Sequence, residues 1–580
     1  MALSLVVPAV VALAQSGPPP NRPAAEKPPE HQVGGLRFVD VSEVTVVNVD
    51  VAVTDKEGFV AGLTPADFEV SQDGKLQPLT NFAVYHDGVR LDTDAAAAPA
   101  PQASVATPAP GAPAAATEGQ PAVAAPTREP SFVALYVDNE NLRPFDRNRV
   151  LNAVRTWVER TLRPPDQMMV VSYQRSLKTL QPFTTKVEDV LSALRQVRMY
   201  TGGRINVDSD RRQIEDYITN NQARSNTIQQ AMDSVRSFSQ EQHNNLTFSV
   251  RSIQDLVSMM SGLPGRKSVI YISDGLPMSP GLELYYALQD GYGVPSILSR
   301  AREFDASNMF RSLVTTAAAA GVTLYTIDAA GLESNTGVEA ENRTARSSLV
   351  SAYLSSNYEE SLVYMADQTG GLAVLNANDP TPGLEKISDR LSSYYSLGYR
   401  MVPTGEDRFH RIEVKLKGHP GVRLDYRRSF IEKSLPTEIG DRVMSGLAFD
   451  IDDNPLQITL SSGLPQPSSA GRWLLPVEIK VPVEKVALIP DGDSLVGYVR
   501  AYYAARDSDG KQSDLQQKEF PVRMTAGQYE SSKASTFTIS ASLLLEPGTY
   551  RISVGVRDDL TNQAGYATIR RAVHPEAKEN

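Results

Sequence analysis

Carboxylate side chains follow two apolar runs of the sequence and could hold a cation. Asp138 and Glu140 come directly after the run at residues 132–137. Asp274 follows the run at residues 268–273. Carboxylates at the ends of neighbouring parallel strands repel each other unless a positive charge lies between them, and a divalent cation prefers such oxygen ligands. The same side chains could instead cap the helices that follow, because the helix dipole favours negative charge there. The spacing leaves both interpretations open.

The elements that must position these carboxylates lie in residues 131–430, where apolar runs alternate with amphipathic stretches. Continuous apolar runs are typical of strands buried on both faces of a parallel sheet. They occur at residues 132–137, 168–173, 268–273 and 322–327. Helical patterns occur at residues 146–162, 187–197, 246–260, 302–320 and 359–369. The sequence therefore predicts an α/β domain with a doubly wound, mostly parallel sheet, in which ligands bind beyond the carboxyl ends of the strands. A polar insertion at residues 205–245 is predicted to be helical and to lie on the surface.

Strand patterns flank this domain on both sides. Residues 36–92 combine short Val- and Thr-rich runs with Asp-Gly turns, which predicts a small β-sandwich-like domain. Residues 440–575 predict a C-terminal β-sandwich. Its strands are expected at residues 473–481, 493–505, 518–524, 535–545 and 548–558.

The segments outside these domains have simple compositions. Residues 1–14 form an apolar run that ends in Ala-Leu-Ala, as in a secretory signal peptide, and residues 15–35 are a Pro-rich spacer. Residues 93–130 are rich in Ala and Pro and contain no aromatic residue, so we expect a disordered linker. We expect an exported protein of the periplasm, cell envelope or extracellular space. No later stretch has ~18 uncharged apolar residues, so we expect no transmembrane span. Association with the envelope is still possible.

The composition excludes several classes of chemistry. The chain has 580 residues, no cysteine and a formal net charge of −11. The absence of cysteine excludes thiol catalysis, disulfides and Cys-ligated metals. The negative charge weighs against a nucleic-acid partner. The six histidines lie outside the predicted strand ends, and Ser273 lacks the first Gly of a nucleophile elbow, so we do not expect an enzyme.

Several motifs taken together resemble the von Willebrand factor A (VWFA) family. They are the apolar strand ending in Asp138, the Ser-Asp-Gly at residues 273–275 and the Leu-Tyr-Thr-Ile-Asp at residues 324–328. Flanking motifs at residues 64–70 and 394–399 are similar to those of exported bacterial VWFA-related proteins. The resemblance covers roughly residues 44–428 and implies a metal-ion-dependent adhesion site, in which a carboxylate of a protein partner completes the coordination of Mg²⁺ or a similar ion.

The metal ligands that the resemblance implies are Asp138, Glu140 and Asp274, with Mg²⁺, Ca²⁺ or Mn²⁺ as the ion. The family motif is Asp-x-Ser-x-Ser, but Glu140 and Leu142 stand in the places of the two serines. The Gly-Gly that precedes the family's Thr is followed here by Arg204, which could place a fixed positive charge where the ion would lie. The site is therefore expected to be degenerate. The expected partner-binding residues are Asn141, Thr201, Arg204 and Gly275.

These features favour an exported protein-binding, adhesion or scaffolding protein whose central domain contacts a protein partner at the strand ends. If the ion is absent, Arg204 or the polar insertion would make the contact. Two alternatives stay open. One is a structural envelope spacer that binds no ligand. The other is a hydrolase that uses paired carboxylates.

Overall fold

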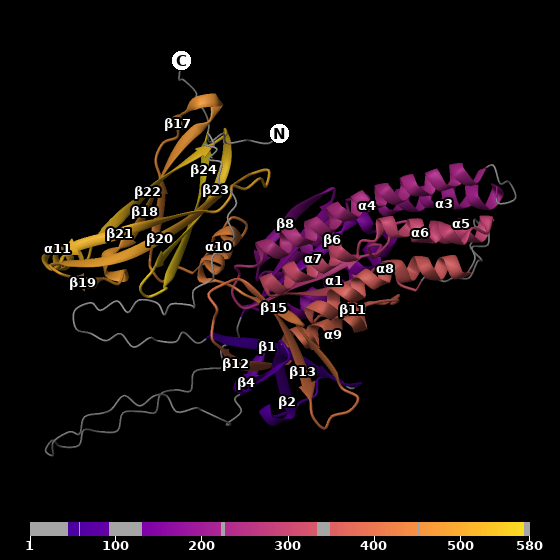
Figure 1. The fold of residues 1–580 in the computed structure, drawn as a ribbon, viewed down its shortest axis with the longest axis horizontal. Coiled ribbons are helices and arrows are strands. Elements are labelled where there is room, and N and C mark those ends of the chain that lie inside the picture. The colour runs from indigo at the N-terminus through magenta and orange to yellow at the C-terminus, as the bar shows by residue number, and fades with distance from the viewer. Residues whose placement is uncertain are drawn as a thin grey trace, which may run out of the picture. The chain divides into compact units, whose positions relative to one another are not determined.

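The computed structural model describes residues 45–56, 58–91, 130–221, 227–332, 348–450 and 453–573 (Figure 1). The predicted signal peptide at residues 1–14, the spacer at 15–35 and, apart from Pro130, the linker at 93–130 lie outside the described residues. None of the described helices is both long enough and apolar enough to cross a membrane.

The central domain is built on a six-stranded mixed sheet in the order β11-β10-β9-β6-β7-β8. Its strands are β6 (Ser131–Asp138), β7 (Gln167–Gln174), β8 (Ser176–Thr184), β9 (Arg266–Ser273), β10 (Val322–Asp328) and β11 (Ala373–Val374). All neighbours run parallel except β7 and β8, which are antiparallel. The four strands that the sequence predicts are confirmed. From β6 the chain proceeds to β7 on one side and later to β9 on the other, so the strand order reverses between β6 and β9.

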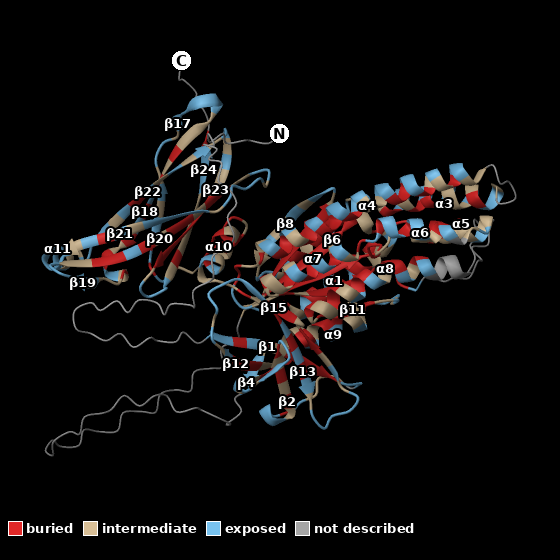
Figure 2. Cartoon of the chain, in the orientation of Figure 1, coloured by how far each residue is buried: buried red, intermediate tan, exposed pale blue. Residues whose placement is uncertain are grey.

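Helices cover both faces of this sheet (Figure 2). Alternate residues of β6 enter two separate cores, with Val133 and Leu135 on one side and Ala134 and Tyr136 on the other. The first core is closed by α1 (Pro144–Thr161), α2 (Val187–Val197) and α9 (Thr381–Ser392). The second is closed by α4 (Ile228–Met259), α7 (Ser307–Ala320) and α8 (Ser348–Thr369). Burial on both faces explains why the strand sequences are continuously apolar.

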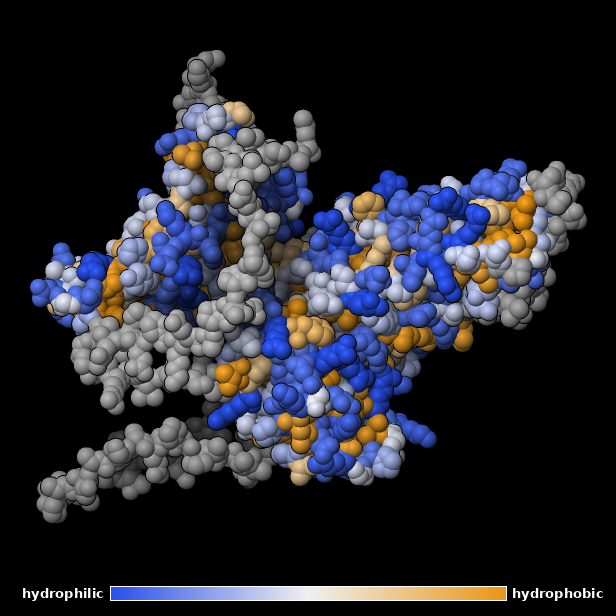
Figure 3. Space-filling model, in the orientation of Figure 1, coloured by the Kyte–Doolittle hydropathy of each residue, from blue (hydrophilic) through white to orange (hydrophobic). Residues whose placement is uncertain are grey.

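The described parts of the polar insertion are helical, as predicted, but their expected surface position is only half right. They form α3 (Arg204–Asn221) and the first part of α4. One side of α3 is hydrophilic and exposed (Figure 3), whereas Arg204, Asp208, Arg211 and Ile218 are buried. Helices α3 and α4 pack on α5 (Leu282–Tyr292) and α6 (Leu298–Ala301) around a small apolar core of their own.

The N-terminal strands form a sandwich with strands from far along the sequence, which corrects two predicted boundaries. The first sheet has the order β14-β1-β12-β4-β5 and the second β15-β13-β2-β3. Residues 36–92 are therefore not a complete sandwich, and residues 394–432 belong to it rather than to the central domain. Both segments contribute to one apolar core, because the short N-terminal strands cannot enclose a core alone. The strands are β1 (Thr45–Thr54), β2 (Phe68–Gln72), β3 (Lys75–Gln77), β4 (Leu79–His86), β5 (Val89–Leu91), β12 (Tyr394–Met401), β13 (Arg408–Leu416), β14 (Arg423–Tyr426) and β15 (Ser429–Glu432).

The C-terminal region begins with α10 (Leu435–Gly446) and continues as two antiparallel sheets around a shared apolar core. The first sheet contains β16 (Thr459–Ser462), β17 (Gln466–Pro467), β18 (Trp473–Pro482) and β22 (Thr536–Leu545). The second contains β19 (Ile489–Asp491), β20 (Ser494–Asp507), β21 (Gln516–Thr525), β23 (Gly548–Asp558) and β24 (Ala564–Val573). A short helix, α11 (Ala526–Ser532), joins β21 to β22. The five predicted strands of this region are confirmed.

The discontinuous sandwich makes a testable prediction, because the chain contains no cysteine of its own. Val46 in β1 lies opposite Arg400 in β12, and both are exposed. Opposite residues of an antiparallel pair have Cα atoms about 4.5–5.5 Å apart, which suits a disulfide. We expect the double variant Val46→Cys/Arg400→Cys to form an intramolecular disulfide on mild oxidation, detected by peptide mapping. The control pair Val46→Cys/Arg408→Cys joins different sheets and should stay reduced. Equal oxidation of the two pairs would contradict the pairing.

Candidate functional site

A pocket of about 210 Å³ lies at the carboxyl ends of the parallel strands, where the strand order reverses. In open α/β sheets this is where ligands bind. Its charged lining comes from the loop after β6, the start of α3, the ends of β9 and β10, and α8. These residues are Arg143, Arg204, Asp274, Asp328 and Glu359.

Asp138 is fully buried, and the protein itself satisfies its carboxylate. One oxygen accepts hydrogen bonds from the Tyr271 hydroxyl at 2.5 Å and the Asn141 side-chain amide at 2.9 Å. The other accepts from the backbone N–H of Asn141 at 3.2 Å, so Asp138 caps the short 3-10 turn Asn139–Asn141. Burial raises the pKa of Asp138 to about 6. Asp138 therefore caps this turn, whereas the N-cap of the α-helix that follows, α1, is Arg143.

Asp274 is buried at the pocket with half of its carboxylate unsatisfied. Its Oδ2 accepts a hydrogen bond from the backbone N–H of Arg143 at 3.0 Å. Its Oδ1 has no hydrogen-bond partner among the described residues. Burial raises the pKa of Asp274 to about 7, although the nearby positive charges of Arg204 and Arg143 oppose this shift. Asp274 therefore holds a proton through much of the acidic range.

Arg204, the first residue of α3, carries the buried positive charge of the pocket. It is 5 % exposed, and its guanidinium lies 4.0 Å from the centre of the Tyr358 ring. Its Nε is 3.4 Å from Asp208, whose other oxygen accepts a hydrogen bond from Arg143 at 2.8 Å. Burial of Asp208 raises its pKa, but attraction to Arg204 and Arg143 is stronger and lowers it to about 2. Asp208 therefore stays ionised and holds both arginines.

The charges continue along α3 in a pattern that the sequence analysis missed. Arg204, Asp208, Arg211 and Glu215 are spaced by three or four residues, so they lie on one face of the helix. Arg211 is 3.4 Å from Asp208 and 2.9 Å from Glu215. Glu283 of α5 is fully buried beside this row, and burial raises its pKa against the attraction of Arg211. Alternating charge at helical spacing is the signal that could have identified this face as a buried network.

The described side chains do not fit the metal site that the resemblance implies. Among residues with described positions, no group of three or more His, Cys, Asp or Glu side chains is arranged to hold a metal ion. Both oxygens of Asp138 accept hydrogen bonds within the protein, and Leu142 is fully buried and has no side-chain oxygen. Arg204 brings a positive charge to Asp274, where an ion would be needed. Asp138, Glu140 and Asp274 therefore do not form the predicted three-ligand cluster.

The predicted partner-binding residues divide into exposed and buried ones. Thr201 is exposed, and its backbone oxygen accepts a hydrogen bond from Gln174 at 2.9 Å. Asn141 is partly buried and donates to Asp138 and Ser249. Arg204 is nearly buried but lines the pocket. Gly275 is buried with φ +89°, and a Cβ there would lie 2.7 Å from the backbone oxygen of Tyr358, so it has no surface for a partner.

The Gly-Gly before Arg204 explains how α3 reaches the pocket. A Cβ on Gly202 would lie 2.3 Å from the backbone oxygen of Leu142, and one on Gly203 would lie 2.6 Å from that of Glu140. Only glycine permits so close an approach to the loop after β6. The backbone N–H of Gly203 donates to Asn139 in this loop at 2.9 Å. The two glycines thus fix the start of α3 beside the strand ends.

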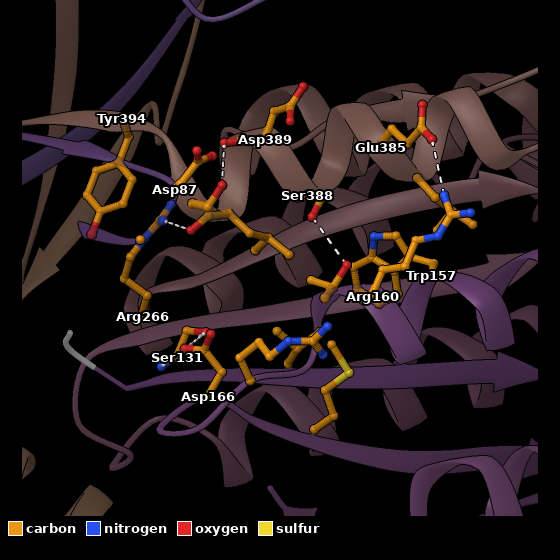
Figure 4. Close-up of a pocket in the computed structure, with 18 of the residues that line it drawn as sticks. Asp87, Ser131, Trp157, Arg160, Asp166, Arg266, Glu385, Ser388, Asp389 and Tyr394 are labelled. Carbon is orange, nitrogen blue, oxygen red and sulfur yellow. Dashed lines mark hydrogen bonds and ion pairs between the residues drawn. The ribbon is translucent and has the colours of Figure 1, made fainter. Parts of the chain in front are cut away.

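A larger cavity of about 370 Å³ lies at the opposite, amino end of the sheet (Figure 4). Several of its charged groups contact other residues of the protein. Asp166 accepts hydrogen bonds from Ser131, and Arg266 stacks on Tyr394 at 3.8 Å. Arg160 lies 3.9 Å from Glu385. Because it lies at the amino ends of the strands and not at their carboxyl ends, we do not assign the function to it.

Comparisons with known proteins identify no family for the chain. No family model matches it, and no curated protein matches it. It is similar to the solved structure of the conserved hypothetical protein BatB from Bacteroides thetaiotaomicron, with 12% identity over 45% of this chain and 96% of that chain and a TM-score of 0.21. It is also similar to an aerotolerance-related membrane protein from Bacteroides fragilis, with 11% identity over 45% of this chain and 98% of that chain and a TM-score of 0.22. A third similar structure is proximal thread matrix protein 1 from the mussel byssus with a zinc-occupied MIDAS motif, with 12% identity over 45% of this chain and 48% of that chain and a TM-score of 0.20. At such TM-scores these likenesses carry no argument about function.

Replacing Asp274 tests the electrostatics of the pocket. Its pKa is raised from 3.8 to about 7, so the folded protein binds this proton more tightly than the unfolded chain does. The resulting contribution to stability is complete below pH 3.8 and is lost as the pH rises to about 7. We expect Asp274→Asn to raise the free energy of unfolding at pH 8 by up to about 4 kcal/mol, and by much less at pH 4. Urea unfolding at the two pH values measures this difference.

The matched control is Asp210→Asn, which alters an exposed carboxylate of α3 and should have little effect at either pH. A loss of stability in Asp274→Asn at pH 8 would contradict the account, because it would show that the ionised carboxylate is held favourably by Arg204.

Proposed function

We propose that the chain is an exported protein-binding or scaffolding protein whose central domain is a doubly wound, VWFA-like module. The strand-end pocket binds an anionic side chain of a protein partner. The guanidinium of Arg204, rather than a metal ion, supplies the positive charge that receives it. The motif resemblance and the pocket at the strand ends support this proposal.

The observation that carries the proposal is the hydrogen-bonding capacity left on Arg204. Its Nε faces Asp208, and its ring contact is with Tyr358. This Nε is buried and has no hydrogen-bond partner among the described residues, because its 3.4 Å contact with Asp208 does not make a hydrogen bond. A planar guanidinium with two terminal N–H₂ groups suits a carboxylate, which it can bind through two parallel hydrogen bonds.

The surroundings of Arg204 limit how the partner group can enter. Tyr358 and Asp208 hold the guanidinium in one orientation, so little side-chain entropy is lost when a ligand binds. A pocket of about 210 Å³ suits a single side chain. Arg143 lies beside it and shares the charge of Asp208. Protonation of Asp274 removes a competing negative charge, so an anionic group is accepted best when the pKa of Asp274 near 7 exceeds the pH.

Arg204→Gln tests the proposal with a defined probe, the peptide acetyl-Gly-Asp-Gly-amide. Loss of a charge-assisted hydrogen-bond pair should weaken binding by about ten- to a hundred-fold. Binding is measured by calorimetry on the full chain at pH 6.5, with acetyl-Gly-Asn-Gly-amide as the uncharged ligand control. Arg212→Gln, an exposed residue of the same helix, is the matched protein control and should bind like the wild type.

Equal affinity of the wild type for the Asp and Asn peptides would contradict the anionic site. It would favour the alternative in which the central domain is a structural spacer. Turnover of chromogenic ester or glycoside substrates that is lost in Asp274→Asn would instead favour the hydrolase.

A further inference from the structure

The C-terminal sandwich contains a long strand that the described part of the chain pairs on one side only. Strand β22 pairs with β18 over its whole length, from Thr536 opposite Pro482 to Leu545 opposite Trp473. The other edge of β18 is taken by β16 and β17. Among the described residues no strand pairs with the second edge of β22. Its outward N–H and C=O groups therefore form a template for another strand.

The sequence of β22 lacks the features that protect an edge strand. It reads TFTISASLLL, with no charged residue, no proline and no glycine. The other long edge strands of the described chain carry such protection. Strand β8 has Lys178 and Pro182, β21 has Pro521 with three charged residues, and β24 has two adjacent arginines. Charge and proline at an edge prevent pairing with a second chain, so β22 differs from its counterparts in the feature that decides whether an edge can pair.

The two faces of β22 are suited to extending the sandwich. The side chains of Phe537, Ile539 and Leu543 point into the core between the sheets. Thr538, Ser540 and Ser542 alternate with them and are exposed. An added strand with the same alternation would continue both the apolar core and the outer row of hydroxyl groups, which can form cross-strand hydrogen bonds.

We propose that β22 pairs antiparallel with β22 of a second copy of this chain, around a two-fold axis near Ser540. Such pairing is isologous, because each strand meets an identical one. It places Thr538 opposite Ser542 of the second copy and joins the four-stranded sheets of the two copies into one continuous sheet. No like charges meet along the contact, because β22 has none. A second copy also supplies the same alternation of apolar and hydroxyl side chains that the edge requires.

The charge of the whole chain sets the salt dependence of this contact. The formal net charge of −11 makes two copies repel at long range. The contact itself is uncharged, so salt screens the repulsion without weakening the pairing. Self-association should therefore strengthen as the salt concentration rises from 20 to 300 mM, whereas a dimer held by ion pairs would weaken.

Charge variants of Ser540 test the proposal by sedimentation velocity of the full chain over a concentration series. Ser540→Lys places two lysines opposite each other at the axis and should weaken dimerisation at least ten-fold, as should Ser540→Glu. An equimolar mixture of the two variants should restore the dimer, because Lys then faces Glu. Gln517→Lys adds the same charge to the exposed edge strand β21 and should leave the dimer intact. Circular dichroism checks that all variants fold.

A second measurement reports the position of the axis. The chain has no cysteine, so Ser540→Cys and Gln517→Cys each carry a single thiol. Mild oxidation should link Ser540→Cys rapidly into a covalent dimer and leave Gln517→Cys monomeric. A wild type that stays monomeric at all concentrations would overturn the proposal. So would a dimer that both charge variants retain, which would place the contact elsewhere or leave the β22 edge to a different partner.

Discussion

The strand-end pocket depends on one buried carboxylate, Asp208, which holds two arginines from different parts of the chain. Arg143 comes from the loop after β6, and Arg204 begins α3. Without Asp208, the repulsion between the positive charges of Arg204 and Arg143 would lack this compensation. With it, they fix the start of α3 against the ends of the parallel strands. The close approach of Gly202 and Gly203 to the same loop makes this arrangement possible.

This ion cluster carries a cost that the fold must offset. Removing charged groups from water is unfavourable, and a buried ion pair is often no more stabilising than a packed apolar pair. The raised pKa values of Asp138 and Asp274 have the same origin, because burial disfavours their charged forms. Asp138 is compensated by hydrogen bonds from Tyr271 and Asn141. Asp274 is compensated only in part. Such imperfectly satisfied groups gather at binding sites, which is why we place the function here.

Local patterns predicted most of the central fold. The runs at residues 132–137 and 268–273 are apolar because both faces of the sheet are covered, and the predicted helix at 187–197 coincides with α2. The N-terminal sandwich was not predictable in this way. Strands β1 and β12 pair although the whole central domain separates them in the sequence. No local pattern in either strand predicts this pairing. The predicted domain boundaries at residues 92 and 430 therefore follow the order of elements along the chain and do not reflect strand pairing.

The position of the candidate site was predicted, but its chemistry was not. The strand ends indicated Asp138, Glu140 and Asp274, and the family motif indicated Arg204. Arg204 and Asp274 line the pocket, and Asp138 ends β6. The family motif then suggested a metal. The polar composition of α3 predicts a solvated helix, because charged residues are rarely buried. Ion pairing among these residues allows them to be buried. In the sequence, such pairing along one face of a helix appears only as an alternation of positive and negative charges.

The central claim is that Arg204, not a metal ion, is the cation of this pocket. Thermal unfolding of the full chain in EDTA and in 5 mM Mg²⁺, Mn²⁺ or Ca²⁺ tests it directly, since a ligand that binds only the folded state raises the unfolding midpoint. The account predicts the same midpoint in all four solutions. A saturable rise with one of the ions that is abolished by Asp274→Asn would contradict it.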